Sequence, residues 1–258
     1  LMNFTTGEVT DVLPDRRKRY LMQYFSKIKR ETLDYTTHRS ELDNVKYVSM
    51  DLHEPYKDIA SIYFPKAQVC ADSFHVIKNL TTCFRDVLLR CRRRTESENL
   101  QYLLSKFRFV FHHNTFLDNE PKYNKRLGRY LNYRELRDLM FSSFPDLQTA
   151  YELKEYYIRL NNTCSIHTAP EAIEEAALKF ADAGIPELEP FSVLLNNWHT
   201  EIANSFTPIQ GVRINNSFME SKNRILEKLL YNSNGFSNFQ RTRKRILYCL
   251  NPNDNYHF

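Results

Sequence analysis

The first ninety residues alternate between short apolar runs and amphipathic stretches. Alternating polar and apolar residues predict a strand over 8–13, and two apolar runs predict strands over 45–50 and 67–71. Apolar residues at helical spacing predict helices after these strands, over 16–29, 55–64 and 73–94. This strand–helix order is typical of a three-layer α/β core with a mostly parallel sheet and flanking helices.

The pattern changes after about residue 94. Up to residue 207 the apolar spacing is helical throughout, and no run predicts a strand. Helices are expected over 97–112, 133–141, 145–160, 170–183 and 190–206, with prolines between them. A last pair is expected over 216–231 and 236–250. The sequence thus predicts an α/β core (1–94), a large all-α insertion (95–207) and C-terminal helices that complete the core (208–258).

Three acidic residues occupy positions that suit metal chemistry. Asp51 ends the strand over 45–50, Asp72 follows the next strand, and Glu220 lies on a distant helix. Open α/β sheets bind ligands at the carboxyl ends of their strands, where both aspartates are expected. Hard divalent cations prefer oxygen ligands, and two such ions can hold the attacking and leaving oxygens of a phosphodiester. The pattern predicts a two-metal phosphoryl-transfer site.

Each of these residues also has a purely structural interpretation. Asp51 and Asp72 could equally cap the helices that follow them, and His75 could simply contact Asp72 one turn along. On the last helix pair, one polar face could be nothing more than a solvated surface. That face comprises Asn216, Glu220, Asn223 and Glu227. The neutral amides beside a single acid favour a site that orients metal-bound water or phosphate.

Composition excludes several classes of protein. Hydrophobic residues make up 42% of the 258 positions, which is enough for a packed core. With only 5 glycines and no glycine-rich phosphate loop, a nucleotide cofactor is not expected. Neither a membrane span nor a signal peptide is apparent. The five cysteines form no close pair, which favours reduced thiols over disulfides or a zinc site.

Basic residues occur in clusters, and the net charge is +5. This excess permits a polyanionic partner, because Arg and Lys supply most of the non-specific affinity for DNA. A cluster of this kind is also common on solvated helix faces. The candidates for DNA contact are Arg90, Arg92, Arg93, Arg94, Arg241, Arg243, Lys244 and Arg245.

An ordered set of motifs resembles one known family. Asp51 is followed by Phe64-Pro65 and Ala67, then by Asp72 with Phe74-His75-Val76 and Lys78. Later matches are Trp198 with Glu201, Asn215-Asn216 with Glu220 and Asn223, and the ending Gly235-Phe236 with Arg241, Arg243 and Arg245. In this order the chain resembles, over nearly its whole length, the DDE domain of the ISL3 family of bacterial insertion-sequence transposases.

The resemblance implies a fold, a reaction and a set of roles. The fold is an RNase H-like core with a helical insertion, and the reaction is metal-dependent cleavage and transfer of DNA strands. Two Mg²⁺ (or Mn²⁺) ions are expected, with Asp51 as the second acid and Glu220 as the third. Asp72 and His75 are expected to be accessory, and Asn216 and Asn223 to position metal-bound water or phosphate. The implied partners are transposon ends and target DNA, in a homo-oligomer associated with the bacterial nucleoid in the cytoplasm.

One departure from the family pattern affects the expected activity. The family's first acid would lie upstream of Leu1, and neither Asp11 nor Asp15 is a credible replacement. The sequence therefore predicts an N-terminally truncated, inactive fragment of a transposase. Two alternatives stay open: a domesticated relic that binds DNA without chemistry, and an RNase H-like nuclease that recognises nucleic-acid structure.

Overall fold

The computed structural model describes residues 1–214, 216–232 and 238–251, and the chain divides into two compact units. Unit 1 combines Leu1–Phe74 with Thr200–Phe258, and unit 2 is His75–His199. The first boundary falls inside the first turn of α3 (Ser73–Arg94), so that one helix belongs to both units. The functional division of the sequence at residues 94 and 207 stays a prediction.

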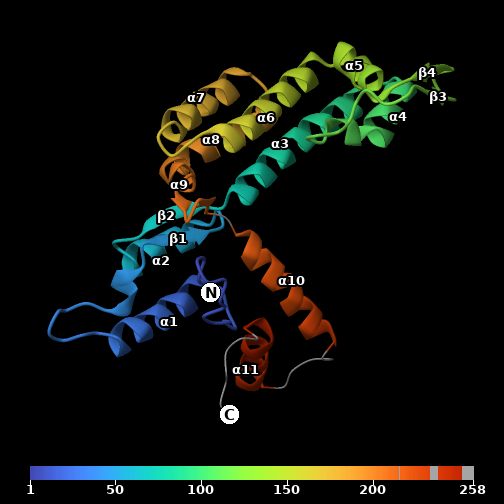
Figure 1. Cartoon of the computed structure of the whole chain (residues 1–258). Helices are drawn as coiled ribbons and strands as arrows, with labels where there is room; N and C mark the ends of the chain where they lie inside the picture. The colour runs from blue at the N-terminus through green and yellow to red at the C-terminus, as the bar shows by residue number, and fades with distance from the viewer. Residues whose placement is uncertain (215, 233–237, 252–258) are drawn as a thin grey trace. The chain divides into compact units, whose positions relative to one another are not determined.

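Unit 1 contains a short parallel sheet at the centre of its fold. β1 (Tyr47–Met50) pairs with β2 (Gln68–Ala71), with Tyr47 opposite Gln68 and Met50 opposite Ala71. α2 (Glu54–Tyr63) connects them. Pro55 lies in its first turn, where a backbone N–H would have no acceptor within the helix, so proline loses no hydrogen bond there. The predicted strands and their crossover helix are confirmed, as Figure 1 shows in blue and cyan.

A second helix packs against the crossover helix through aromatic side chains. α1 (Lys18–Glu31) buries Leu21 and Phe25 against Ile59 and Tyr63 of α2. The rings of Phe25 and Tyr63 lie 5.8 Å apart. A 3-10 helix, η1 (Glu41–Asn44), follows in the connection to β1. Helix α1 begins two residues later than its apolar spacing predicted.

The segment over 8–13 is not a strand, so the predicted third strand was wrong. Val9 packs instead on Ile246 and Leu250 of α11 (Phe239–Leu250). Asn251, just after that helix, accepts from the backbone N–H of Val9 and donates to its carbonyl, each at 2.9 Å. A side-chain amide therefore supplies the hydrogen bonds that a neighbouring strand would supply, and polar–apolar alternation alone cannot distinguish the two.

The rest of unit 1 returns the chain to the sheet. α9 (His199–Asn204) ends where the Asn204 amide donates to the Val69 carbonyl at 2.9 Å. β5 (Pro208–Ile209) and β6 (Val212–Arg213) then form a small hairpin that leads to α10 (Ser217–Asn232). The predicted helix over 190–206 is two helices, because the first ends at Asn197 and Trp198 separates it from α9.

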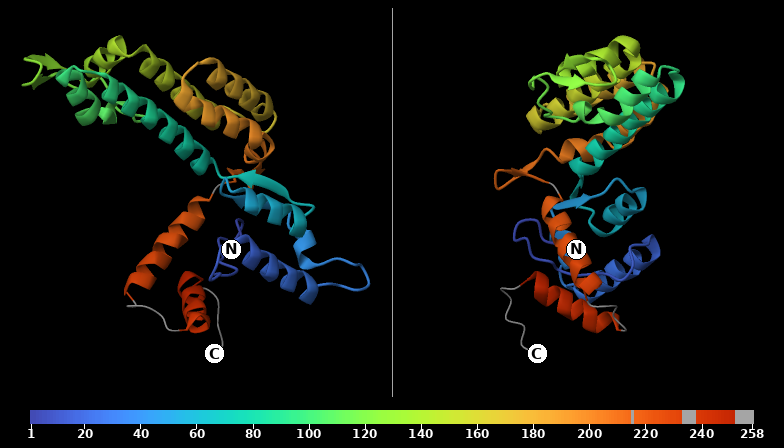
Figure 2. Two further views of the ribbon diagram at one scale, coloured as in Figure 1. Left: turned by 180° about the vertical axis from the view of Figure 1, so that it is seen from behind. Right: turned by 90° about the vertical axis from the view of Figure 1, so that its right-hand side faces the viewer.

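Unit 2 is mainly helical. Its elements after α3 are α4 (Glu98–Lys106), the 3-10 helix η2 (Arg108–Phe111), β3 (Lys122–Asn124), β4 (Arg129–Leu131), α5 (Tyr133–Ser143), α6 (Pro145–Thr163), α7 (Ala169–Asp182), the 3-10 helix η3 (Pro186–Leu188) and α8 (Glu189–Asn197). Tyr157, Phe180 and Phe191 pack edge to face in its core. The antiparallel hairpin β3–β4 corrects the expectation of an all-α insertion. Figure 2 shows the hairpin from two further sides.

The length and polarity of the helices bear on whether any of them could span a membrane. In the described part of the structure, every helix is too short or too polar to cross a membrane. The five cysteines are free thiols, as their spacing predicted. Burial raises the pKa of Cys70 to about 12, so this thiol stays protonated at neutral pH.

Candidate active site at the strand ends

Two aspartates lie at the same edge of the parallel sheet. Asp51 directly follows β1 and Asp72 directly follows β2, and the Asp72 N–H donates to the Met50 carbonyl at 2.9 Å. Because the strands are parallel and in register, their carboxyl ends coincide. Asp72 is buried, with 1% of its surface exposed, whereas Asp51 is accessible to solvent. The structure therefore brings together two carboxylates that lie 21 positions apart in the sequence.

Asp51 and Asp72 differ in their distance from the helices that follow them. The N-cap residue of α2 is His53, whose backbone N–H donates to the Asp51 carbonyl. The helix α3, by contrast, begins at Ser73, immediately after Asp72.

A histidine joins the two aspartates. Single ligand atoms of Asp51, Asp72 and His75 all lie within 4.8 Å of one another. His75 follows Asp72 by three residues in the first turn of α3, so local helix geometry sets its place beside Asp72. Two carboxylates and one imidazole form a donor set that suits a divalent cation. The sequence grouped Asp72 with His75, and the structure adds Asp51 to them.

Asn216 attaches the start of α10 to this edge of the sheet. Its side-chain oxygen accepts from the Ser49 hydroxyl of β1 at 2.8 Å. Its backbone N–H donates to an Asp72 carboxylate oxygen at 3.3 Å, and its carbonyl accepts from the Glu220 N–H at 2.9 Å. We call Ser49, Asn216 and Asp72 the strand-end clamp. The clamp fixes where α10 leaves the sheet.

The predicted third acid sits one turn beyond this clamp. Glu220 lies in the first turn of α10 and is partly exposed, and Asn223 is exposed in the next turn. Glu220 is not a member of the cluster formed by Asp51, Asp72 and His75 among the described residues. The structure therefore places its helix at the strand ends without bringing its carboxylate into that group.

Helix α10 also contacts α11, and one lysine connects the two helices. The Lys222 ammonium group donates to the Leu250 carbonyl, at the last turn of α11, at 2.5 Å. A cation at this position also interacts favourably with the helix dipole. Ser49 and Lys222 were not identified from the sequence, because a serine in a strand and a lysine on a polar helix face carry no distinctive pattern.

A buried carboxylate anchors α11 to the N-terminal segment. Asp11 accepts from Arg243 of α11 at 2.5 Å and from the Tyr24 hydroxyl at 2.6 Å. Burial alone would raise the pKa of Asp11, but the hydrogen bonds from Arg243 and Tyr24 outweigh it and lower the pKa. The same contact raises the pKa of Arg243. The Asp11 carboxylate thus holds α11 and the N-terminal segment together.

The structure separates the predicted DNA-contacting residues into two groups. Arg90 pairs with Asp146 at 2.9 Å and Glu187 at 2.8 Å within unit 2, and Arg243 is held by Asp11. Both have structural partners, which makes them weak candidates for phosphate contact. The remaining basic candidates are exposed on the ends of α3 and on α11, namely Arg92, Arg93, Arg94, Arg241, Lys244 and Arg245.

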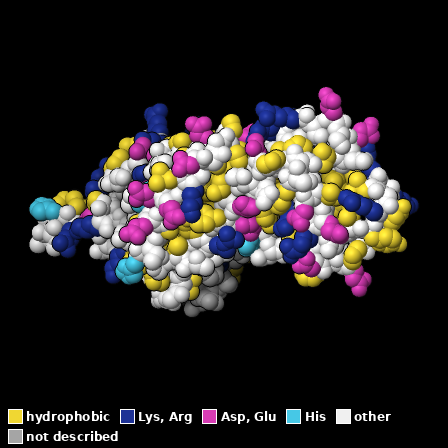
Figure 3. Space-filling view, turned by 90° about the horizontal axis from the view of Figure 1, so that it is seen from above, with side chains coloured by type: hydrophobic (Ala, Val, Ile, Leu, Met, Phe, Trp, Pro, Cys, Tyr) yellow, Lys and Arg dark blue, Asp and Glu magenta, His cyan; other side chains and the backbone are white. Residues whose placement is uncertain are grey.

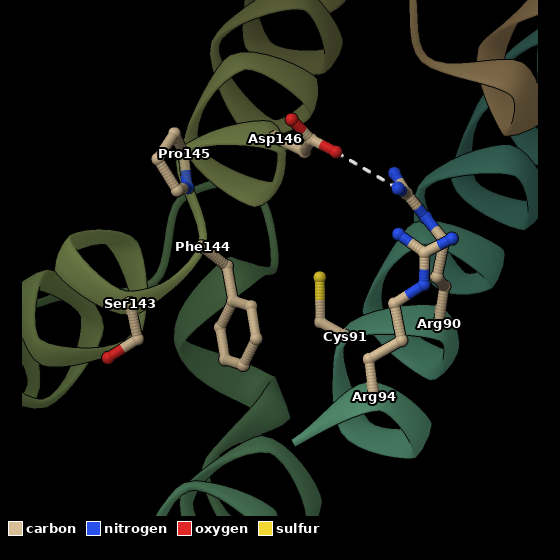
Figure 4. A pocket seen from close by; sticks show the side chains of 7 residues that line it. All are labelled: Arg90, Cys91, Arg94, Ser143, Phe144, Pro145 and Asp146. Carbon is tan, nitrogen blue, oxygen red and sulfur yellow. Dashed lines mark hydrogen bonds and ion pairs between the residues drawn. The ribbon is translucent and has the colours of Figure 1, made fainter.

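A small cavity of about 150 Å³ lies beside Arg90. Figure 4 shows Arg90 and Arg94 reaching from α3 toward Asp146, with Phe144 and Cys91 below them. Asp146 already balances part of this positive charge. On the face drawn in Figure 3, basic and acidic side chains are similarly intermingled, so the overall charge does not by itself locate a nucleic-acid surface.

Comparison with known proteins identifies the family. Residues 1–246 match the family model of the ISL3 DDE transposases, which is described as a transposase family. Neither a curated protein nor a solved structure matches the chain. Transposases of the DDE class generally use divalent metal ions and act on DNA, and the Asp51 cluster offers ligands for such an ion. The chain belongs to the ISL3 family of DDE transposases.

Proposed function

We propose that the chain provides the catalytic domain that cleaves and transfers the DNA strands of an insertion sequence, in a metal-dependent reaction. The observation that supports this most directly is the juxtaposition of Asp51 and Asp72 at adjacent parallel strand ends, with α10 clamped to the same edge. An RNase H-like core is part of the proposal. The crossover from β1 through α2 to β2 is consistent with one of its parallel strand pairs.

The proposal gives each site residue a distinct role. Asp51 and Glu220 are metal ligands, and Asp72 and His75 support the site beside Asp51. Two Mg²⁺ or Mn²⁺ ions, when bound, would activate the attacking oxygen and stabilise the leaving one. Asp51 is accessible to a substrate phosphate, whereas Asp72 is buried and also accepts the Asn216 N–H. Asp72 therefore combines negative charge at the site with a structural hydrogen bond.

DNA contact is assigned to the exposed basic residues. Arg92, Arg93 and Arg94 at the end of α3, with Arg241, Lys244 and Arg245 on α11, would neutralise backbone phosphates. Such contacts give affinity without sequence information. Asn223, exposed one turn after Glu220, is proposed to orient phosphate or metal-bound water. A homo-oligomer acting on paired DNA ends in the bacterial cytoplasm completes the proposal.

Metal binding tests the site without depending on turnover. Isothermal titration of the 258-residue chain with Mn²⁺ should show binding that Asp51→Asn weakens at least about tenfold. Asp58→Asn is the matched control, because Asp58 is an exposed aspartate on α2 that pairs with Lys18. Equal Mn²⁺ affinity in the Asp51→Asn variant and the unchanged chain would overturn the assignment of Asp51.

Strand cleavage tests the reaction itself. A supercoiled plasmid carrying the element's ends should be nicked in Mn²⁺ by a version of the protein that carries all three acids expected of the family, and Asp51→Asn or Glu220→Gln in that version should abolish nicking while DNA binding stays nearly unchanged. Cleavage retained in either variant would contradict the roles given to these acids. DNA binding with neither metal binding nor cleavage would identify a DNA-binding relic instead. Hydrolysis without joining of the cut ends would indicate a structure-specific nuclease.

A further inference from the structure

The hairpin of unit 2 exposes two tyrosines side by side. Tyr123 of β3 is directly opposite Tyr130 of β4, and the two ring centroids lie 5.2 Å apart. Their exposed fractions are 54% and 67%, which is high for such large side chains. Because residues opposite each other in an antiparallel pair share a face, both rings project from one side of the ribbon. Exposed aromatic pairs of this kind mark interaction sites more often than scattered single residues do.

The opposite face of the ribbon is packed at two of its four positions, so the tyrosines have a fixed base. Asn124 and Leu131, which alternate with the tyrosines along the strands, are 8% and 6% exposed. The Asn124 side chain accepts from the backbone N–H groups of Arg126 and Leu127, at 3.1 and 3.2 Å. Gly128 closes the loop in a left-handed conformation, with φ of 68°. The loop is therefore held by its own backbone contacts.

Further contacts attach the hairpin to the helices of unit 2. Arg126 donates to Glu98 at 2.7 Å and to Asn99 at 3.1 Å, and its guanidinium group lies 5.3 Å from the Tyr102 ring centroid. After β4, Asn132 caps α5 with reciprocal hydrogen bonds to Glu135. Figure 1 shows the hairpin beyond α4 and α5 within this unit. These contacts thus attach the hairpin that carries the two tyrosines to the helices of unit 2.

The hairpin that carries the pair is basic. Lys125 in the loop is exposed, and so are Lys122 and Arg129, which alternate with the tyrosines and therefore lie on the other face of the ribbon. The acidic residue nearest in sequence is Glu120, before β3. An exposed aromatic pair on a basic hairpin complements bases on an anionic backbone, whereas an apolar protein partner would require a wider apolar rim.

We propose that the β3–β4 hairpin is a stacking platform for unpaired DNA bases, with Tyr123 and Tyr130 as the stacking rings and Lys122, Lys125 and Arg129 as phosphate contacts. The proposal rests on the proposed function in that it takes DNA as the ligand. Unpaired bases are the favoured partner because every base offers a π-face, while bases in a duplex are stacked on one another. The platform gives unit 2 a DNA-binding role of its own, distinct from the strand-end acids of unit 1.

The test compares single-stranded and duplex DNA binding in EDTA, where the metal site takes no part. Fluorescence anisotropy of a labelled 20-nucleotide mixed-sequence strand should show that the double variant Tyr123→Ala/Tyr130→Ala binds about tenfold more weakly than the unchanged chain. Binding to the blunt duplex of the same sequence should change less than twofold. The double variant Tyr123→Phe/Tyr130→Phe should retain single-strand affinity, because stacking needs the ring and not the hydroxyl.

Tyr35→Ala is the matched control, since Tyr35 is 77% exposed and lies outside the hairpin. It should leave both affinities unchanged, and the melting temperatures of all variants should agree because the substituted rings are exposed. Single-strand affinity unchanged in the double alanine variant would overturn the platform. Equal losses for single strand and duplex would overturn it as well, and would indicate contact with the duplex backbone. Neither result bears on Mn²⁺ binding by Asp51, so the two proposals fail separately.

Discussion

The Ser49 hydroxyl donates a 2.8 Å hydrogen bond to the side-chain oxygen of Asn216, which lies 167 residues later in the chain. This contact joins β1 to the start of α10, and the Asn216 N–H extends it to Asp72. The sequence assigned Asn216 to metal-bound water or phosphate. The structure gives its amide oxygen a different partner, so Asn216 acts as a positioning residue for the helix that carries Glu220.

Loss of the Ser49 hydroxyl should loosen this helix. We expect Ser49→Ala to lower the free energy of unfolding by about 1 kcal/mol, the usual contribution of one hydrogen bond. Hydrogen exchange should accelerate at the Glu220 amide, which bonds to the Asn216 carbonyl. The control is Ser61→Ala, because the Ser61 hydroxyl bonds only locally to the Lys57 carbonyl, one helical turn back. Exchange at Glu220 that is the same in both variants would argue against the clamp.

Asp72 allows charge and hydrogen bonding to be separated. Asp72→Asn keeps an oxygen that can accept the Asn216 N–H but removes the negative charge. We expect its Mn²⁺ affinity to fall at least about tenfold with little change in the urea midpoint. Asp72→Ala should lose both, because it leaves the Asn216 N–H without this acceptor. A variant Asp72→Asn that binds Mn²⁺ as the unchanged chain does would show that Asp72 has only a structural role.

The hydroxyl of Tyr24 should stabilise the protein through ionised Asp11. The bonds from Arg243 and Tyr24 lower the pKa of Asp11 below 3.8, its ordinary value. A lowered carboxyl pKa contributes stability above pH 3.8, and this stability is lost as the pH falls through the folded-state pKa. We expect Tyr24→Phe to cost about 1–2 kcal/mol at pH 7. Urea unfolding from pH 7 to pH 3 should show this difference shrinking in acid.

The exposed Tyr35 supplies the control for this experiment. Tyr35→Phe removes a hydroxyl at a side chain that is 77% exposed, and it should leave stability unchanged at every pH. A cost for Tyr24→Phe that stays constant down to pH 3 would mean that the ionised state of Asp11 plays no part in it.

A buried lysine should stabilise unit 2. Lys154 is 3% exposed and donates to the Phe111 carbonyl at 2.7 Å and to Glu155 at 2.6 Å. Burial lowers the pKa of Lys154, although Glu155 opposes the shift. Lys154→Met keeps the aliphatic stem but leaves the Phe111 carbonyl without this donor, so we expect a loss of about 1–3 kcal/mol. The single tryptophan, Trp198, is buried in unit 2 and reports its unfolding by fluorescence.

The surface lysine Lys179 offers a comparison for that substitution. Lys179 is exposed, pairs with Glu175 one turn away on α7 and lies 4.3 Å from the Tyr156 ring centroid, and such exposed contacts contribute little in water. Lys179→Met should therefore change stability by less than about 1 kcal/mol. If Lys154→Met changed the stability as little as Lys179→Met, the buried ammonium group of Lys154 would not stabilise unit 2.

Local patterns predicted the elements whose apolar residues face a core. The strands β1 and β2 and most helices of unit 2 follow this rule, and helix α6 begins at the proline that its pattern indicated. The hairpin β3–β4 was not predicted because each strand has only three residues and most of them are exposed aromatic or basic residues. The strand predicted over 8–13 was wrong because the side chain of Asn251, far along the chain, supplies the backbone hydrogen bonds of Val9.

The candidate site was predictable only in part, for a related reason. Strand ends and helix positions identify Asp51, Asp72 and Glu220, because these depend on local structure. The clamp depends on a contact between residues that are distant in sequence, and Ser49 alone has no distinguishing neighbours. Likewise, neither Arg90 nor Arg243 differs in sequence from other clustered basic residues, and only their acidic partners show that they are structural.

The long sequence separation within the clamp also orders events during synthesis. The strand pair β1–β2 is complete once residue 71 has emerged from the ribosome, but Asn216 emerges only after the whole of unit 2. A nascent or prematurely ended chain can therefore hold Asp51 and Asp72 in place while lacking the helix that bears Glu220. If Asp51, Asp72 and Glu220 are all needed for cutting, a chain that stops before α10 would leave the DNA around it intact.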